Sequence, residues 1–495
     1  MASLYKDLLS PERFRTSTVL NRNIISESES DRGRLLFCAA FRRLQQKAQV
    51  FSMEPNAAVR SRLTHSFEVS QMGRYIADQI CFKLLQNKWA TNEECAALVT
   101  FVETACLMHD IGNPPFGHFG EAAISEWFRT KGPDVIMKSC SDGKGELGTA
   151  DPRLTKTLAD FVAFDGNPQG LRVVAKLQRN SDDHGLNLTK TTIASYLKYV
   201  RSSVQTSTEI ASPFTKKCGY FITEADIVSN VWQKFAYTTP QRFPLAYIME
   251  AADDIAYCIS DLEDSIEKGL LVQSIALSEI HSQWKELGFS SEDSAATAIE
   301  MILQNAASGK TLDNKLFTYT DFRTNLNREL VQYCAEQYIN EHARVLDGSL
   351  PSLIPSDSPA GKVLDLLKTY CRAKVYCHET VQRVELAGYT AIYGLLDQFA
   401  CLLNCNADRF SCSLDYSKNK DSTNKSIIIE KKLLTLFPKN YVKVYFDDLK
   451  KIKATDVDYK FREWNIRAHL VTDFLSGMTD DFAMKTYQTL SGMKL

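Results

Sequence analysis

Apolar side chains recur every three or four residues along most of the chain, which is the spacing of an amphipathic helix. Leu98, Val102, Ala105 and Met108 follow this spacing, and Gly112 with a Pro-Pro pair comes just after them. Glycine and proline end helices, so a helix that stops near residue 108 is predicted here, with a turn behind it.

Two further stretches carry the same period. Leu63, Val69, Met72 and Ile76 predict one long helix, and another is predicted after Pro244. The sequence contains no sustained strand alternation, no internal repeat and no GxxxxGK phosphate loop. These patterns together predict an all-α fold.

Polar, turn-forming stretches separate the predicted helices. The first helix is expected to be capped by Ser30 and Asp31, whose side chains can accept hydrogen bonds from its free N–H groups. Turns, links or exposed loops are expected in stretches rich in glycine, serine, asparagine, lysine or proline, namely 132–151, 164–170, 346–361 and 404–425.

The composition is that of a large globular protein. The chain has 495 residues, of which 44% are hydrophobic and 24% charged, so it exceeds one usual core and is not disordered throughout. The net charge of -2 gives no overall basic signature for nucleic acid. No apolar run approaches the roughly 18 residues of a membrane helix. The 13 cysteines include no CxxC pair, so reduced thiols, a cytoplasmic location and no membrane partner are expected.

His109 and Asp110 stand side by side where the predicted helix ends. A chain that changes direction there can bring both side chains to one ion, and imidazole and carboxylate both ligate divalent metals. A capped helix end with a hydrogen-bonded histidine is the alternative, and these two residues alone do not separate the two interpretations. Further on, His118 precedes Glu121 by three residues, which predicts an acid–base pair on the first turn of the next helix.

More ligand-type residues lie on the other predicted helices. Asp253, Tyr257 and Asp261 recur every four residues, which places three polar side chains on one face. Burying them is costly unless a metal or a substrate satisfies them. Taken with a histidine on the long helix, the ligands form a set that suits one Mn, Mg, Fe, Co or Ni ion better than a closed zinc site. This set is His65, His109, Asp110 and one carboxylate of the Asp253-Asp254 pair.

Longer stretches carry a family resemblance. They are SDRGRLLFCAAFRRLQQKAQVF from Ser30, AAVRSRLTHSFEV from Ala57, HDIGNPPFGHFGE from His109, FDGNPQG from Phe164, MEAADDIAYCISDLEDSIEKG from Met249, VELAGY at Val384 and SGMTDDFA at Ser476. With these stretches the sequence resembles the HD-domain deoxynucleoside triphosphate triphosphohydrolases. The resemblance is densest over residues 30–269 and sparser over 280–470.

The resemblance implies a role for each matching residue. It assigns one divalent metal ion, Mg²⁺ or Mn²⁺ with Co, Ni or Fe as alternatives, to His65, His109, Asp110 and Asp253. The catalytic pair is then His118 and Glu121. The substrate-binding residues are expected to be Gln49, Arg62, Asn167, Lys198, Tyr199, Lys217, Tyr257, Asp261 and Glu385.

The resemblance also implies an activity, the hydrolysis of dGTP to deoxyguanosine and inorganic triphosphate by a homo-oligomer, a tetramer or a hexamer. A broader dNTP triphosphohydrolase and an HD nucleotidase stay open as alternatives. So does a nucleotide or single-stranded DNA sensor whose hydrolysis is regulatory. Leu433 stands where guanine-selective relatives place an arginine, so guanine selection is expected to rest more on Glu385.

Three parts of the chain are expected on this basis. Residues 1–29 form an N-terminal lead, and residues 30–280 form the HD-domain phosphohydrolase core. Residues 281–495 form an appended, mainly helical region, which is expected to contribute to the substrate pocket and to oligomer contacts.

Overall fold

The structure is a computed structural model that describes residues 4–141, 151–179, 182–210, 212–290, 292–414 and 427–493. The α-helices up to residue 267 are α1 (Ile24–Leu36), α2 (Ala39–Arg43), α3 (Arg62–Gln86), α4 (Asn92–Met108), α5 (Gly117–Thr130), α6 (Gly132–Cys140), α7 (Pro152–Val162), α8 (Gly166–Arg172), α9 (Lys190–Tyr196), α10 (Ala225–Lys234) and α11 (Pro244–Glu267). The later ones are α12 (Gln273–Glu286), α13 (Ser294–Ser308), α14 (Tyr319–Asn340), α15 (His342–Leu346), α16 (Pro359–Cys371), α17 (Glu379–Asn404), α18 (Ala407–Leu414), α19 (Ile428–Leu434), α20 (Lys439–Leu449), α21 (Tyr459–Ser476) and α22 (Asp480–Leu490).

Short elements complete the fold. They are the 3₁₀ turns η1 (Leu44–Gln46) and η3 (Ile222–Glu224), the π-helical turns η2 (Val173–Leu177) and η4 (Arg372–Tyr376), and the strands β1 (Arg201–Ser202) and β2 (Cys218–Tyr220). The two strands pair in parallel. The all-α prediction is confirmed, since this small pair is the only sheet among the described residues.

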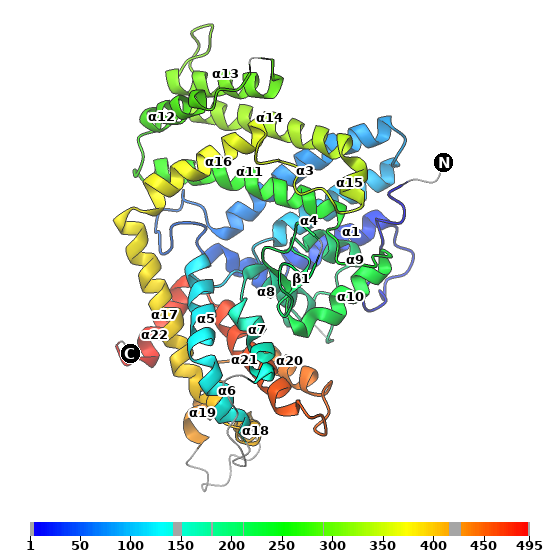
Figure 1. Cartoon of the computed structure of the whole chain (residues 1–495), viewed down its shortest axis with the longest axis vertical. Helices are drawn as coiled ribbons and strands as arrows, with labels where there is room; N and C mark the ends of the chain where they lie inside the picture. Colours follow the sequence, from blue (N-terminus) through cyan, green and yellow to red (C-terminus); the bar gives the residue numbers. More distant parts are fainter. Residues whose placement is uncertain are drawn as a thin grey trace.

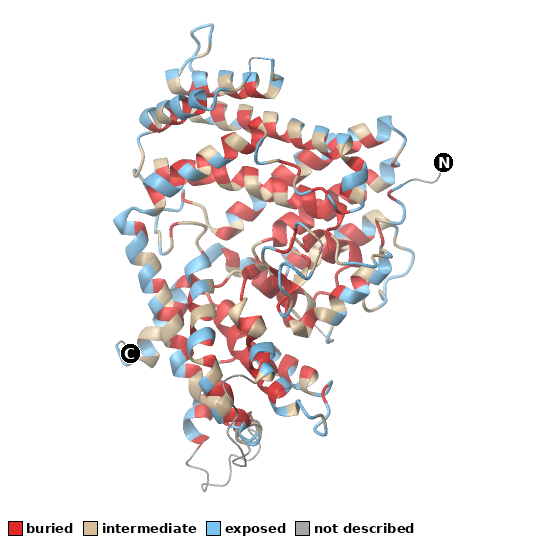
Figure 2. Ribbon diagram, viewed as in Figure 1, coloured by how far each residue is buried: buried red, intermediate tan, exposed pale blue. Residues whose placement is uncertain are grey.

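The centre of the molecule is built from α3, α4 and α11, which pack on one another (Figure 1). Capping boxes begin two of these helices, with Ser61 and Thr64 at α3 and Thr91 and Glu94 at α4. Helix α4 ends at Met108, as the sequence predicts. Figure 2 shows that these central helices are mostly buried while the outer helices carry exposed faces. The elements that carry the candidate ligands are therefore fixed on several sides.

Residues beyond 280 pack on the core in two groups. Helix α14 lies against α3, and α16 lies against α11. At the other end of the molecule, α17 packs along α5 and α22, and α21 packs on α6 and α7 (Figure 1). Helix α21 thus returns to the helices that follow the His-Asp pair, and α22 packs on α17.

Among the described residues, α17 is the one helix long and apolar enough to cross a membrane by length and composition alone. Its apolar residues Ile392, Leu395 and Phe399 are fully buried in the protein. A core helix of a globular protein meets the same two criteria, so this helix is weak support for a membrane span.

Several expected boundaries were wrong. The first helix begins at Ile24 with Asn23 as its cap, and Asp31 instead lies buried inside α1, where it pairs with Arg13. Helices α6, α8 and α18 occupy parts of the segments expected to be turns or loops. Gly132 and Pro133 stand at the start of α6 and Gly166 at the start of α8, where such residues are compatible with a helix. Residues 142–150 and 415–426 of those segments lie outside the described residues.

Candidate metal centre and active site

Three helices bring the candidate metal ligands together. His65 lies in the first turn of α3, His109 directly follows α4, and Asp253 lies in the middle of α11. One ligand atom from each of these residues lies within 4.8 Å of the other two. Asp253 Oδ1 is 3.5 Å from Nε2 of both histidines. These distances leave room for one ion between the three side chains.

Asp110 stands at the edge of this cluster. Its Oδ2 is 3.5 Å from His109 Nε2, and it also accepts a hydrogen bond of 2.6 Å from Arg62 Nη1. Asn113 Nδ2 donates to the other carboxylate oxygen at 2.6 Å. Burial alone would raise the pKa of Asp110, but Arg62 and His109 lower it to about 2. The carboxylate is therefore ionised and held in place.

The two histidines fit a bound cation. Both ring nitrogens of His65 and Nε2 of His109 are buried without a hydrogen-bond partner among the described residues. His109 Nδ1 is 2.7 Å from the carbonyl oxygen of Cys106, which can only accept, so Nδ1 carries the proton. The lone pair of Nε2 then points into the cluster. Leaving such atoms unpaired costs free energy, and a divalent metal would remove that cost.

His118 and Glu121 form the expected pair on the first turn of α5. His118 Nδ1 donates to Glu121 Oε2 at 2.7 Å, and Glu121 Oε1 accepts from the backbone N–H of Gly166 at 2.7 Å. The hydrogen bond that Glu121 accepts raises the pKa of His118. The His118 side chain remains 83% exposed, so its free nitrogen is open to a ligand.

Positive charge gathers on the other side of the cluster. Lys198 Nζ is 3.5 Å from Asp253 Oδ2, and Lys217 Nζ is 2.5 Å from Asp165 Oδ2. Burial would lower the pKa of Lys198, but Asp253 and other carboxylates raise it overall. Asn167 is bound by the same Asp165, through its side-chain N–H at 2.6 Å. Lys198, Lys217 and Asn167 thus form a part of the cavity wall that can bind an anionic ligand.

A cavity of about 890 Å³ joins these groups. It is lined by most of the predicted site residues, namely Gln49, Arg62, His109, Asp110, His118, Glu121, Asn167, Lys198, Tyr199, Lys217, Asp253, Tyr257 and Glu385. This volume lies in the range that holds a nucleotide-sized ligand. His65 and Asp261 are not among its lining residues.

Comparison with known proteins shows which family the chain is similar to. The HD domain family model matches residues 62–141, which include His65, His109, Asp110 and His118. Deoxyguanosinetriphosphate triphosphohydrolases from Enterobacter sp. (strain 638) and from Klebsiella pneumoniae (strain 342) are each 35% identical to this chain. The aligned regions span 97% and 98% of this chain, respectively, and 97% of each relative. The homologous protein of Cronobacter sakazakii is 35% identical over 94% of both chains.

The chain belongs to the deoxyguanosinetriphosphate triphosphohydrolase family. The fourth ligand that the family resemblance implies, Asp253, lies outside the matched HD segment and comes from α11. In this member of the family, the candidate ligand set is therefore complete only when α11 packs on α3 and α4.

Asp261 lies beneath the cavity of this family member, not on its wall. The hydroxyl of Tyr257 is 2.8 Å from that of Tyr376, and Tyr376 donates to the carboxylate of Asp261. Asp261 is 2% exposed, and burial raises its pKa to about 7 although both tyrosines lower it by hydrogen bonding. Asp261 therefore holds the hydroxyl of Tyr376 in place and, through it, the hydroxyl of Tyr257.

Several lining residues were not predicted from the sequence, and three of them share one spacing. Lys368, Arg372 and Tyr376 come from α16 and the π-helical turn η4, and all three line the cavity. Their spacing of four residues is the same signal that singled out Asp253, Tyr257 and Asp261 on α11. Lys368 also binds Asp254 at 2.9 Å, which ties that carboxylate to α16.

Helix α17 also contributes side chains to the cavity wall. Glu385 on α17 lines it together with Leu386, and burial raises the pKa of Glu385. Leu433, where the family resemblance suggests an arginine, is buried on α19 and is not a lining residue.

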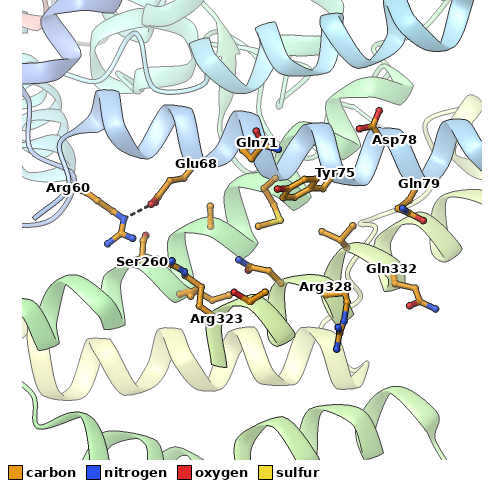
Figure 3. A pocket seen from close by; sticks show the side chains of 16 residues that line it. Arg60, Glu68, Gln71, Tyr75, Asp78, Gln79, Ser260, Arg323, Arg328 and Gln332 are labelled. Atoms are coloured by element: carbon orange, nitrogen blue, oxygen red, sulfur yellow. Dashed lines mark hydrogen bonds and ion pairs between the residues drawn. The ribbon is translucent and has the colours of Figure 1, made fainter. Parts of the chain in front are cut away.

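A second cavity, of about 730 Å³, lies between α3, α11 and α14 and shares no lining residue with the first (Figure 3). Arg60 and Arg323 at its rim are paired with glutamates at 2.7 and 2.8 Å. The metal-ligand cluster and the His118–Glu121 pair both face the first cavity, so the candidate active site is there.

Proposed function

We propose that this protein hydrolyses dGTP to deoxyguanosine and inorganic triphosphate with one divalent metal ion, Mg²⁺ or Mn²⁺. The names of its relatives support the substrate. The observation that carries the chemistry is that unpaired histidine nitrogens and a carboxylate converge on the cavity that also contains His118.

His65, His109, Asp110 and Asp253 would hold the ion. When bound, it supplies positive charge to the phosphoryl oxygens as a Lewis acid. The remaining steps use the chain's own side chains.

The triphosphate is bound by cations that already stand at the cavity wall. Lys198 and Lys217 reach the charged oxygens, and Asn167 donates a neutral hydrogen bond beside them. Arg62, held by Asp110, adds a planar donor on the opposite side. Lys368 and Arg372 extend this positive surface toward η4. Together these groups compensate the charge of a substrate that a chain of net charge -2 would otherwise repel.

His118 handles the proton of the reaction. Its raised pKa favours the protonated ring, so it donates a proton to the 5′-oxygen as the bond from that oxygen to the α-phosphorus breaks. Water supplies the new oxygen on that phosphorus and releases a proton to solvent, from which His118 is protonated again. The products are a neutral nucleoside and triphosphate. Glu121 orients the ring through Nδ1 and leaves Nε2 for the transfer. Such a donor contributes typically ~10² to 10⁴ in rate.

The sugar and the base occupy the rest of the cavity. The hydroxyls of Tyr257 and Tyr376 are engaged with each other and with Asp261, and the rings pack against the deoxyribose. A ring face offers a 2′-hydroxyl no hydrogen-bond partner. Gln49 lines the wall next to Arg62, within reach of the sugar or the base edge. Glu385 accepts hydrogen bonds from the N1 and N2 donors of guanine, which adenine lacks.

Product analysis tests this proposal. The protein is incubated with each of the four dNTPs and Mg²⁺ or Mn²⁺, and nucleosides and phosphates are separated. We expect deoxyguanosine and triphosphate from dGTP, with EDTA abolishing both. Release of dGMP with pyrophosphate, or of orthophosphate alone, would refute the proposed reaction, and equal turnover of all four dNTPs would refute the guanine preference.

A further inference from the structure

A buried carboxylate in the C-terminal segment accepts hydrogen bonds from two segments that line the candidate active site. Asp480 is the first residue of α22 and is 4% exposed. Its Oδ1 accepts a hydrogen bond from the backbone N–H of Phe116 at 3.1 Å, and its Oδ2 accepts one from Ala48 at 3.1 Å. Ala48 directly precedes Gln49, and Phe116 comes two residues before His118.

Phe116 stands at a strained point of the backbone. Its φ of +61° is in the left-handed region, which residues other than glycine seldom adopt. Gly117 follows with a φ of +52°. This turn sets the direction in which α5 starts, and no side chain caps that helix. The orientation of His118 and Glu121 on the first turn therefore depends on what holds Phe116.

A second contact from the same segment runs beside the first. Lys47 is buried, and its Nζ donates to the carbonyl oxygens of Asn113 at 2.5 Å and Ser476 at 2.6 Å. Burial lowers the pKa of Lys47 to about 7. The end of α21 and the start of α22 are thus joined to the turn between α4 and α5 at Asn113 and at Phe116.

Both hydrogen bonds of the Asp480 side chain are made outside its own helix. A structural cap would accept hydrogen bonds from the first N–H groups of α22, but Thr479 does this by accepting from Phe482. Both oxygens of Asp480 bind N–H groups that are more than 360 residues away in sequence. The buried carboxylate thus joins the segments at Ala48 and Phe116, and burial raises its pKa.

We propose that Asp480 is a positioning residue of the hydrolase, which holds the turn at Phe116 so that His118 and Glu121 face the substrate. It acts through backbone N–H groups and touches neither substrate nor metal. This inference rests on the proposed function for its kinetic consequence, but the geometry of the His118–Glu121 pair can be measured without any substrate.

The test compares three variants of the full-length protein. Asp480→Ala removes both hydrogen bonds, whereas Asp480→Asn keeps the size and one acceptor oxygen. Asp481→Asn is the matched control, because Asp481 is the next residue of α22 but pairs with Lys485 at the surface. We expect kcat to fall about 10- to 100-fold in Asp480→Ala and less in Asp480→Asn, with KM and metal content within about twofold of the parent.

A second readout is the pKa of His118, followed by NMR and assigned with His118→Gln. We expect it to fall toward the ordinary histidine value in Asp480→Ala, because Glu121 is no longer held against the ring. Unchanged kcat and pKa in both Asp480 variants, or a loss of kcat no larger than in Asp481→Asn, would overturn the proposal. A parent protein that turns over no dNTP would refute the proposed function instead, and the titration would still test the positioning.

Discussion

Asp253 and Asp254 are chain neighbours with different partners. Asp253 faces His65 and His109, whereas Asp254 binds Lys368. We expect Asp253→Asn to lose bound metal and activity together, and Asp254→Asn to keep full metal content, as measured by elemental analysis. Equal metal loss in the two variants would mean that the ligand has been assigned to the wrong aspartate.

The His118–Glu121 pair predicts a shift in the pH profile. The pKa of His118 is raised by Glu121, and the proposed role needs the protonated ring, so kcat is retained below that pKa and lost as the pH rises through it. Glu121→Gln removes the negative charge, so the alkaline limb of kcat should move to lower pH. A limb that stays in place would assign the titration to another group.

The preference for guanine over adenine is expected to depend on Glu385. Glu385→Ala should lower the ratio of dGTP to dATP turnover, because the guanine donors lose their acceptor. Glu379→Ala is the matched control, since Glu379 lies on the same helix but pairs with Arg383 at the surface. If the ratio is the same in both variants, Glu385 does not read the base.

Among the elements, the turn after α4 is closely packed against α8. A methyl group on Gly112 would lie 2.0 Å from the backbone nitrogen of Gly170 and 2.2 Å from the carbonyl oxygen of Gly166. Backbone atoms of α8 cannot yield easily, so Gly112→Ala should destabilise the fold by about 1 to 3 kcal/mol and weaken metal binding. Gly33→Ala, which meets nothing within 4 Å on α1, should instead stabilise the protein by about 0.5 to 1 kcal/mol. Thermal melts and metal titration of the two variants check this; comparable melting temperatures would contradict it.

The predicted elements differ in how well local patterns define them. The helix ending at Met108 and the helix after Pro244 follow from apolar spacing and from proline or glycine at their ends. The start of α1 was missed because the buried position of Asp31 depends on Arg13 and Thr189, which no local pattern shows. Likewise, Lys368, Arg372 and Tyr376 reach the site only because α16 packs on α11. Long-range packing decides such positions.

At the scale of the whole molecule, the C-terminal helices complete the site that the central helices begin. Glu385 on α17 and Asp480 on α22 come from beyond residue 280, while His65 and His109 come from the core. The division at residue 280 and the tetramer or hexamer expected from the family resemblance stay predictions. Light scattering of the purified protein measures the oligomer, and a monomer at working concentration would contradict that expectation.

In the proposed reaction, water attacks the α-phosphorus of dGTP and the bond to the 5′-oxygen breaks. Hydrolysis in water labelled with ¹⁸O, followed by mass spectrometry of both products, tests it most directly. We predict one ¹⁸O atom in the inorganic triphosphate and none in deoxyguanosine. Label in deoxyguanosine, or in dGMP, pyrophosphate or orthophosphate, would contradict the account.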